Sequence, residues 1–239
     1  MREHRVVRVH ALCSELGVSA ATVRRDLEIL EEQGQVRRVH GGAVSVDSML
    51  DEPLFDDKAS LSTKEKFAIA RKALDYIQPD DTIFLDGGST VLGLAHLLRD
   101  RSNLTVVTNS LRAAQELSGH GPRLLLIGGE LRRRSQTLVG PMARHLLEEV
   151  YLDKAFMGTI GLSLENGLTT TDPNEAYPKQ LVLEHAREVI LLADSSKYGK
   201  VSFAKAGRLD QVQVLITDAA LPRKAVNDLR KRGIRVVRA

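Results

Sequence analysis

Short apolar runs alternate with longer amphipathic runs from residue 63 to the end of the chain, and this alternation constrains the fold more than any other feature. The apolar runs are brief and almost continuous, which is typical of strands buried on both faces of a sheet. They lie at residues 82–85, 104–107, 123–127, 154–157, 189–193, 212–216 and 234–237. Helical spacing of apolar residues separates them at residues 64–77, 91–98, 111–117, 142–150, 180–186 and 223–232. Strands that alternate with helices predict an α/β fold, a parallel sheet with helices on both faces.

Small and hydroxylic residues recur where the predicted strands end. In open parallel sheets, ligands bind at the carboxyl ends of the strands. Glycines there let backbone amides approach a ligand, and amides at a helix start favour an anion such as a phosphate. The candidate binding residues are Asp86, Gly87, Gly88, Ser89, Thr90, Asn109, Ser110, Gly128, Gly129, Asp194 and Lys197. The alternative for each loop is that glycine only makes a turn and that serine or threonine only caps a helix.

Residues 9–34 have the spacing of a helix-turn-helix. Gly17 suits a left-handed helix end, and Ser19 suits the N-cap of a second helix that runs from residue 20 to about 33 and stops at Gly34. At helical spacing, one face carries Ala20, Val23, Leu27 and Leu30, whereas Ala21, Thr22, Arg25 and Glu28 project to the other side with Arg24 on the flank. Small residues and arginines at a helix start suit entry into the major groove of DNA. The alternative is a solvated charged face.

Residues 36–44 predict a hairpin, or wing, whose tip is Gly41-Gly42. Arg37 and Arg38 would lie beside the duplex, where they would contact phosphates rather than read sequence. We therefore divide the chain into a winged helix-turn-helix at residues 1–46, an acidic linker at residues 47–62 and a Rossmann-like parallel-sheet domain at residues 63–239.

Composition excludes several classes of protein. The net charge of +3 arises from 34 basic and 31 acidic residues, so DNA binding must be argued from the positions of the arginines and not from their number. There is no apolar run near 18 residues, which argues against a membrane protein. The single cysteine, Cys13, suits a reducing cytoplasm and is expected to pack on the apolar side of its helix. The seven histidines are scattered, so we expect no metal site and no cofactor.

The segments at residues 19–27 (SAATVRRDL) and 37–43 (RRVHGGA) resemble the DeoR family of bacterial transcriptional regulators. The resemblance continues through residues 107–110, 128–132, 139–141, 153–156, 167–170 and 192–197. It implies a repressor of a sugar-catabolism operon whose sensor domain is similar to ribose-5-phosphate isomerase and glucosamine-6-phosphate deaminase. It also implies that a phosphorylated sugar binds there and changes the affinity for double-stranded operator DNA, and that the protein is a homodimer or homotetramer.

The resemblance carries functional residues onto matching positions. The DNA-binding set becomes Ser19, Thr22, Arg24, Arg25, Arg37, Arg38 and His40. Lys179 joins the effector-binding set, and Glu175, four residues earlier, either pairs with Lys179 or faces the sugar. Arg132, Arg133 and Arg134 are expected in a solvated loop or a subunit contact rather than in the pocket.

Three departures from the family pattern shape the expectations. Residues 1–7 are too short and too charged for the helix that family members carry before the one near Val9, so we expect a truncated or wrongly started chain or an impaired DNA-binding domain. Ile160 stands where the family often has a polar residue. Pro178 should kink the helix near Lys179 or begin it.

Two alternative functions remain open at this point. The first is a sugar-phosphate isomerase, for which Glu130, Asp86, Asp194 or Glu175 would supply the base. The second is a sugar-phosphate-binding protein that has lost DNA binding.

Overall fold

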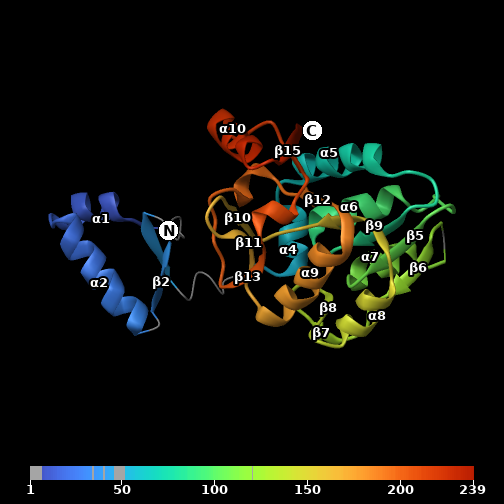
Figure 1. Cartoon of the computed structure of the whole chain (residues 1–239), viewed down its shortest axis with the longest axis horizontal. Helices are drawn as coiled ribbons and strands as arrows, with labels where there is room; N and C mark the ends of the chain where they lie inside the picture. Colours follow the sequence, from blue (N-terminus) through green and yellow to red (C-terminus); the bar gives the residue numbers. More distant parts are fainter. Residues whose placement is uncertain (1–6, 34, 40, 46–51, 120) are drawn as a thin grey trace.

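The computed structural model describes residues 7–33, 35–39, 41–45, 52–119 and 121–239 (Figure 1). Its centre is a seven-stranded sheet in which every neighbouring pair is parallel. The strands, in spatial order, are β15 (Arg235–Arg238), β14 (Val214–Thr217), β12 (Ala186–Leu192), β9 (Leu152–Met157), β4 (Thr82–Leu85), β5 (Thr105–Thr108) and β6 (Arg123–Leu126). These are the seven strands predicted from the apolar runs, so the predicted fold class is confirmed.

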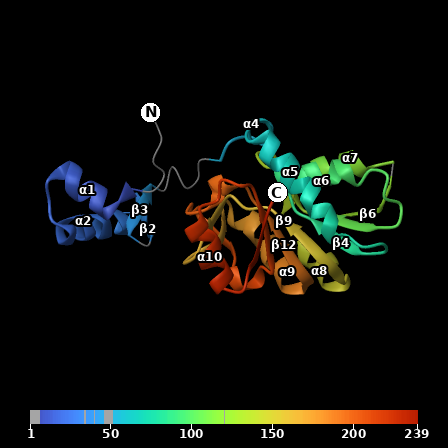
Figure 2. The same ribbon diagram turned by 90° about the horizontal axis from the view of Figure 1, so that it is seen from above.

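Helices cover both faces of this sheet (Figure 2). One face carries α5 (Thr63–Ala73), α6 (Ser89–Leu97) and α7 (Leu111–Leu117), and the other carries α8 (Ala143–Glu149), α9 (Pro173–His185) and α10 (Arg223–Lys231). Each helix buries one apolar stripe against the strands, as Ile69 and Ala73 of α5 and Leu229 of α10 do. The two faces therefore form two separate hydrophobic cores.

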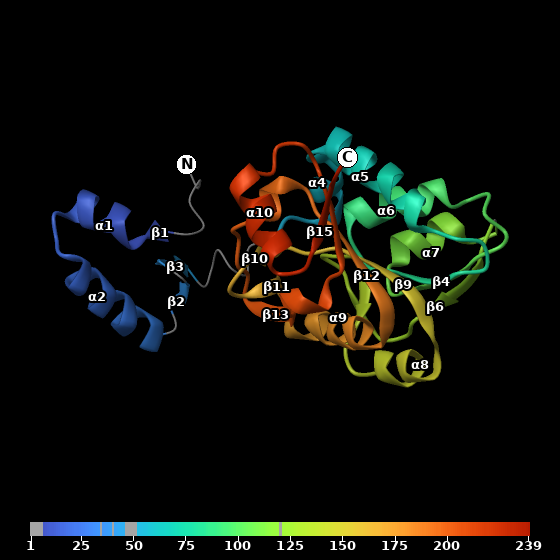
Figure 3. The ribbon, with the colours of Figure 1, turned by 45° about the horizontal axis from the view of Figure 1, so that its top comes forward.

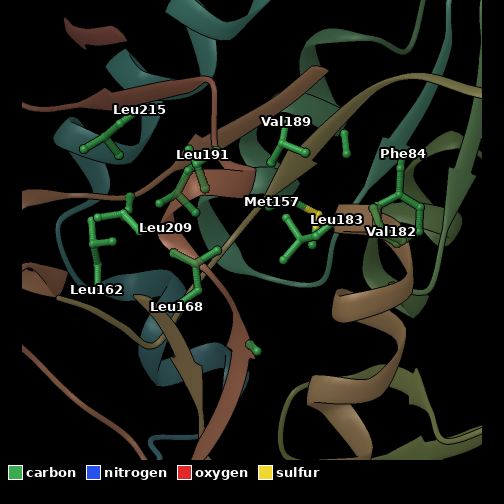
Figure 4. Close-up of a cluster of buried hydrophobic side chains, with 14 of the residues drawn as sticks. Phe84, Met157, Leu162, Leu168, Val182, Leu183, Val189, Leu191, Leu209 and Leu215 are labelled. Carbon is green, nitrogen blue, oxygen red and sulfur yellow. The ribbon is translucent and has the colours of Figure 1, made fainter. Parts of the chain in front are cut away.

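The core on the α9 side is one cluster of buried side chains from the parallel sheet, α9, β10 and β11 (Figure 4). Met157 of β9 and Leu191 of β12 are buried in the same cluster as Val182 of α9. Leu162 and Leu168 extend the cluster beyond the sheet. This packing fixes α9 to the strand ends that carry the polar loops.

Two small antiparallel sheets were not predicted. β7 (Glu130–Arg132) pairs with β8 (Thr137–Val139), and β11 (Gly167–Thr170) lies between β10 (Gly161–Ser163) and β13 (Ala204–Gly207). Three 3-10 turns, η1 (Leu74–Tyr76), η2 (Ser195–Lys197) and η3 (Leu209–Gln211), complete the domain. The small sheets extend the domain beyond the parallel sheet.

Helix α9 begins earlier than the sequence suggested. The apolar spacing predicted a helix at residues 180–186 with Pro178 as a kink or a start, but α9 begins at Pro173 and continues through Pro178. Proline cannot donate to the carbonyl four residues before it. That carbonyl, of Asn174, instead accepts a hydrogen bond of 3.1 Å from the Gly140 amide. The lost helical bond is replaced, so the helix continues.

Residues 52–60 differ from the expected linker, and we call them the strap. They contain α4 (Phe55–Ser60), whose first residue is buried. The Phe55 amide donates to the Arg134 carbonyl at 3.0 Å, and Glu52 is fully buried. The acidic composition of these residues suggested that they are exposed to solvent. Glu52 can nevertheless be buried because it pairs with a basic residue far away in the sequence.

The N-terminal part contains β1 (Val7–Arg8), α1 (Val9–Leu16), α2 (Ala20–Glu32), β2 (Val36–Val39) and β3 (Gly42–Ser45). As predicted, Gly17 ends α1 in the left-handed conformation, and the Ser19 side chain accepts from the Thr22 amide. β3 lies between β1 and β2, and a Cβ on Gly42 would lie 2.2 Å from the Val7 carbonyl oxygen. Close approach of β1 therefore requires glycine at this position of the wing.

A small core holds this winged helix-turn-helix together. Val23 and Leu27 of α2 and Ala43 of β3 are buried, and Cys13 is half-buried against them. Ala20, which was expected in the core, is exposed because it begins α2 at the turn. The predicted stop at Gly34 lies outside the described residues, as do residues 1–6, on which the expectation of a missing helix rests. None of the helices in the described parts is long and apolar enough to cross a membrane.

Candidate functional site

A hollow opens at the carboxyl ends of β4, β9 and β12, which run side by side in the sheet (Figure 3). The strand order reverses here, because β5 and β6 continue to one side of β4 whereas β9 and β12 lie on the other. Such a switch point is where open α/β sheets bind ligands. The chain topology thus makes this part of the sheet edge the candidate binding site.

Six of the predicted effector-binding residues line the hollow: Gly87, Gly88, Ser89, Thr90, Lys179 and Lys197. Asp86 lies beneath it and is 1% exposed, and Asp194 lines an adjoining hollow that also contains Lys197. The loops after β4 and β12 are therefore brought together as expected.

Asn109, Ser110, Gly128 and Gly129 do not line the hollow. Ser110 caps α7 by accepting from the Ala113 amide, and the Asn109 side chain donates to the Leu138 carbonyl at 3.4 Å. A Cβ on Gly129 would come within 2.5 Å of the Val139 carbonyl oxygen, so this glycine permits a close turn. These loops follow β5 and β6, on the side of β4 away from β9, and a binding role for these four residues stays a prediction.

Several residues that line the hollow were not among the predicted effector-binding residues. They are Lys58, Lys66, Ser135, Gly158 and Thr159, while Ile160 and Glu175, which were discussed for other reasons, line the hollow as well. Lys58 and Lys66 lie on α4 and α5, which precede the first strand of the sheet, so the rule of strand ends could not find them. Gly158 to Ile160 follow β9 and satisfy that rule.

A buried ion pair forms the floor of the hollow. The Lys179 ammonium group donates to the Asp86 carboxylate, which also accepts from the Gly158 amide at 2.9 Å. Burial lowers the pKa of Lys179, but the charges of Asp86 and Glu175 outweigh it and hold that pKa above its ordinary value. Lys179 therefore stays charged, and it fixes the loops after β4 and β9 relative to α9.

Glu175 lies one helical turn before Lys179, with 4.0 Å between its carboxylate and the ammonium group. Burial raises the pKa of Glu175; Lys179 opposes this shift, and the charge of Glu52 adds to it. Arg132 lies 3.2 Å from the same carboxylate. The predicted pairing of Glu175 with Lys179 is present, and Glu175 also faces the hollow.

Arg132 is not a solvated loop residue, contrary to the expectation for residues 132–134. Its side chain is 14% exposed and contacts the carboxylates of Glu52 at 2.7 Å, Asp172 at 3.0 Å and Glu175. Three carboxylates close together require a shared cation, and the arginine supplies it. Arg132 thus connects the strap to the first turn of α9.

The strap is anchored through both Glu52 and Lys58. Glu52 accepts from Lys58 at 2.5 Å and from Thr171 at 2.6 Å. Burial raises the pKa of Glu52, but the charge and hydrogen bond of Lys58, the hydrogen bond of Thr171 and the charge of Arg132 outweigh it, so that pKa lies below its ordinary value. The Lys58 carbonyl accepts from the Lys66 ammonium group and, at 3.4 Å, from the Ser89 hydroxyl.

Positive charge accumulates around Lys66. Burial lowers the pKa of this lysine, and the charges of Lys197 and Lys58 lower it further against the opposing effect of Asp194. The hollow can therefore stabilise an anion. In the described parts of the chain, no group of three or more His, Cys, Asp or Glu could hold a metal ion.

The second predicted site lies on the winged helix-turn-helix. Ser19, Thr22, Arg24 and Arg25 are exposed at the start of α2. Arg38 of β2 forms an ion pair with Glu28 of α2 at 3.1 Å, which ties the wing to this helix. Arg37 lies in β2 opposite Val44, and His40 lies outside the described residues.

Family models match both parts of the chain, a DeoR-like helix-turn-helix domain at residues 1–49 and a DeoR C-terminal sensor domain at residues 61–219. The chain belongs to the DeoR family. It is a DNA-binding transcriptional repressor of the DeoR type and not an enzyme, since similar proteins along nearly its whole length are transcriptional regulators.

Three relatives illustrate the extent of the DeoR match. The HTH-type transcriptional regulator GlpR of Haloferax volcanii is 38% identical over 96% of this chain and 90% of its own length. A putative aga operon transcriptional repressor of Escherichia coli O157:H7 is 35% identical over 99% of this chain and 89% of its own. The glycerol-3-phosphate regulon repressor of Escherichia coli K12 is 35% identical over 93% of this chain and 88% of its own.

Solved structures resemble the DeoR sensor domain in fold. Ribose 5-phosphate isomerase A of Methanocaldococcus jannaschii is 19% identical with a TM-score of 0.42, over 56% of this chain and 53% of that one. The eIF2B beta subunit of Chaetomium thermophilum is 16% identical with a TM-score of 0.45, over 64% of this chain and 48% of that one. The chain thus spans about half the length of these structures.

Proposed function

We propose that this DeoR-family protein represses an operon for the catabolism of a sugar or polyol, and that a phosphorylated sugar or polyol in the hollow releases it from DNA. The observation that carries this proposal is the joint placement of the α6 N-terminus and four lysines at the switch point of the sheet. Backbone amides at a helix start and lysine ammonium groups are the usual partners of a phosphate.

The charge distribution favours an anionic ligand. Lys58, Lys66 and Lys197 surround one side of the hollow, and their mutual repulsion contributes to the lowered pKa of Lys66. A bound phosphate would relieve that repulsion and would accept from the amides of residues 89–91. An uncharged sugar would gain neither interaction, so the proposal requires a phosphorylated ligand.

Other residues that line the hollow suit hydroxyl groups. Glu175 offers carboxylate oxygens, and Ser135 and Thr159 offer hydroxyls. Relatives named for a glycerol-3-phosphate regulon and an aga operon support a polyhydroxylated phosphate ester as the ligand class. Ile160 adds an apolar contact that would discriminate among such esters.

The DNA side of the proposal uses α2 and the wing. Exposed Thr22 and Arg25 at the start of α2 would contact base edges in the major groove, and Arg24 and Arg38 would position the protein on phosphates. We further propose a cytoplasmic homodimer or homotetramer, because a two-fold assembly matches a symmetric operator.

The test is fluorescence anisotropy at fixed salt, on DNA from upstream of its own gene and of neighbouring sugar genes, with and without a panel of phosphosugars. We expect specific binding that one phosphosugar reverses, while its dephosphorylated form does not. Specific binding that no phosphorylated compound alters would contradict the effector proposal, and absence of specific binding would contradict the operator proposal.

A matched pair of variants links the effect to the hollow. Lys66→Met should weaken the response to the phosphosugar, because it removes a lysine of the hollow. Lys64→Met changes an exposed lysine on the same helix and should respond as the wild type does. An equal response of both variants would place the ligand elsewhere.

A further inference from the structure

The strap is held in place by groups that also line the effector hollow. Lys58 lines the hollow and donates from its ammonium group to Glu52, the first described residue after the gap at residues 46–51. Lys66 and Ser89, which line the hollow as well, both donate to the Lys58 carbonyl. Two donors of lining residues outside the strap, the Lys66 ammonium group and the Ser89 hydroxyl, therefore fasten it, whereas the ion pair between Lys58 and Glu52 lies within the strap.

A second set of contacts links the strap to Glu175, another residue that lines the hollow. Glu52 contacts Arg132 at 2.7 Å, and Arg132 contacts Glu175, which lines the hollow. The strap thus meets the hollow through a cation that it shares with a lining carboxylate. A negative charge bound in the hollow would therefore change the electrostatic interactions of both Glu175 and Glu52.

An anion and the docked strap compete for the same donors. To coordinate a phosphate, Lys66 and Ser89 must turn from the Lys58 carbonyl. Binding of the anion and docking of the strap therefore oppose each other.

We propose that the strap is the switch between the two domains: an anion in the hollow takes these donors and detaches residues 52–60 from the sensor domain. The inference rests on the proposed function, since it assumes that an anion binds in the hollow. With the strap docked, the fixed part of the sensor domain begins at Glu52; with the strap detached, it begins near α5. Detachment therefore adds residues 52–62 to the chain between the DNA-binding domain and the fixed part of the sensor domain.

A longer connection weakens binding to a two-part operator. When one DNA-binding domain is bound, the second finds its half-site at an effective concentration that falls as the connection lengthens beyond the span. The coupling is reciprocal, so any change that detaches the strap must also tighten anion binding. Tighter anion binding after loss of a strap contact therefore indicates a switch. Loss of a merely structural contact would weaken anion binding instead.

Hydrogen–deuterium exchange of the full chain tests the first half of the inference, with inorganic phosphate as the probe and chloride at equal ionic strength as the control. We expect phosphate to protect the amides of residues 89–91 and to speed exchange of the Phe55 and Lys58 amides. The latter two donate to the Arg134 and Leu54 carbonyls in the docked strap. Protection at residues 89–91 without faster exchange in the strap would overturn the switch and leave the proposed function intact. No protection at residues 89–91 would overturn both.

Phosphate affinity of two variants, measured by titration calorimetry, tests the second half. Glu52→Gln keeps the shape of the side chain but removes the charge that Arg132 contacts, which weakens docking of the strap. We therefore expect this variant to bind phosphate about tenfold more tightly, equivalent to about 1.4 kcal/mol. Asp57→Asn makes the same change at an exposed position of the strap and should bind as the wild type does. Unchanged or weaker phosphate binding by Glu52→Gln would overturn the inference. If this variant does not fold, the hydrogen–deuterium exchange of the wild type still tests the inference independently.

Discussion

Replacement of Lys179 by methionine tests whether the sensor domain depends on the buried ion pair beneath the hollow. Lys179 is 4% exposed, and its ammonium group contacts Asp86, which is 1% exposed. Methionine preserves much of the volume of the side chain but removes the charge. Asp86 would keep the hydrogen bond from the Gly158 amide, and Glu175 would keep Arg132.

The expected loss is large because the remaining carboxylates are buried. Removing one partner of a buried pair typically costs about 3–5 kcal/mol. We expect a loss of that size in the free energy of unfolding of the sensor domain, which would be a large fraction of the roughly 5–15 kcal/mol of a typical domain. Glu175, whose pKa is raised by burial, would lose the opposing charge of Lys179. A carboxyl with a raised pKa favours the folded state more at low pH, so the loss should shrink as the pH falls from neutral toward 4.5.

Urea unfolding followed by tyrosine fluorescence measures this loss. The chain has no tryptophan, and its four tyrosines lie between residues 76 and 198, so the signal reports the sensor domain alone. Lys72→Met is the matched control, because Lys72 pairs with Asp75 at 2.8 Å on the exposed surface. Surface pairs contribute little, and this variant should unfold close to the wild type.

A double variant separates the contribution of the ion pair to stability from the contribution of side-chain packing. Asp86→Asn combined with Lys179→Met removes both charges and should recover part of the loss. The reasoning is refuted if Lys179→Met unfolds at the same urea concentration as Lys72→Met, or if its loss does not depend on pH.

Three further results are expected. Arg25→Ala should weaken binding to the operator by roughly 1–3 kcal/mol and binding to random DNA much less if Arg25 reads a base edge; equal weakening in anisotropy would assign it to a phosphate. Leu27→Ala should lower the stability of the small core that Leu27 shares with Val23 by about 2–5 kcal/mol and abolish DNA binding. Phosphate should still protect the start of α6 in this variant. Unchanged operator affinity would contradict the role of that core. The pKa of Glu52 is lowered, so the stability it gives the strap should be present above pH 4.5 and lost as the pH falls through the lowered pKa. Acid exchange measurements should show this loss in the wild type, and the same loss in Glu52→Gln would contradict the assignment.

The parallel sheet was predictable because its strands are short, nearly continuous apolar runs, and its central strands, such as β4, are largely buried. Residues 82–85 are apolar without interruption, apart from the initial threonine, and they form β4 with the predicted bounds. The strands of the small sheets lack that signal, since Gly161 and Gly167 begin β10 and β11 and polar residues make up much of β7 and β8. Their pairing depends on neighbours brought by the rest of the fold.

The binding site was predictable only in part, because the rule of strand ends does not give the strand order. Ser89 and Lys197 were found, since their loops flank the switch point. Asn109 obeys the same rule but follows β5, which lies on the other side of β4. The burial of Glu52 could not be foreseen, because its partners Arg132 and Thr171 are far away in the sequence.

The ion pair between Arg38 and Glu28 has a consequence for the thermodynamics of operator binding. Each DNA phosphate neutralised by a protein cation releases condensed counterions, and this release gives a slope of about 0.9 per contact in a plot of log affinity against log salt. Arg38 already has a carboxylate 3.1 Å away, so a phosphate contact would exchange one anionic partner for another and leave Glu28 beside the duplex. The slope should therefore be smaller than the number of arginines on this surface suggests. The wing would then contribute more to the orientation of the protein on the duplex than to the salt dependence of its affinity.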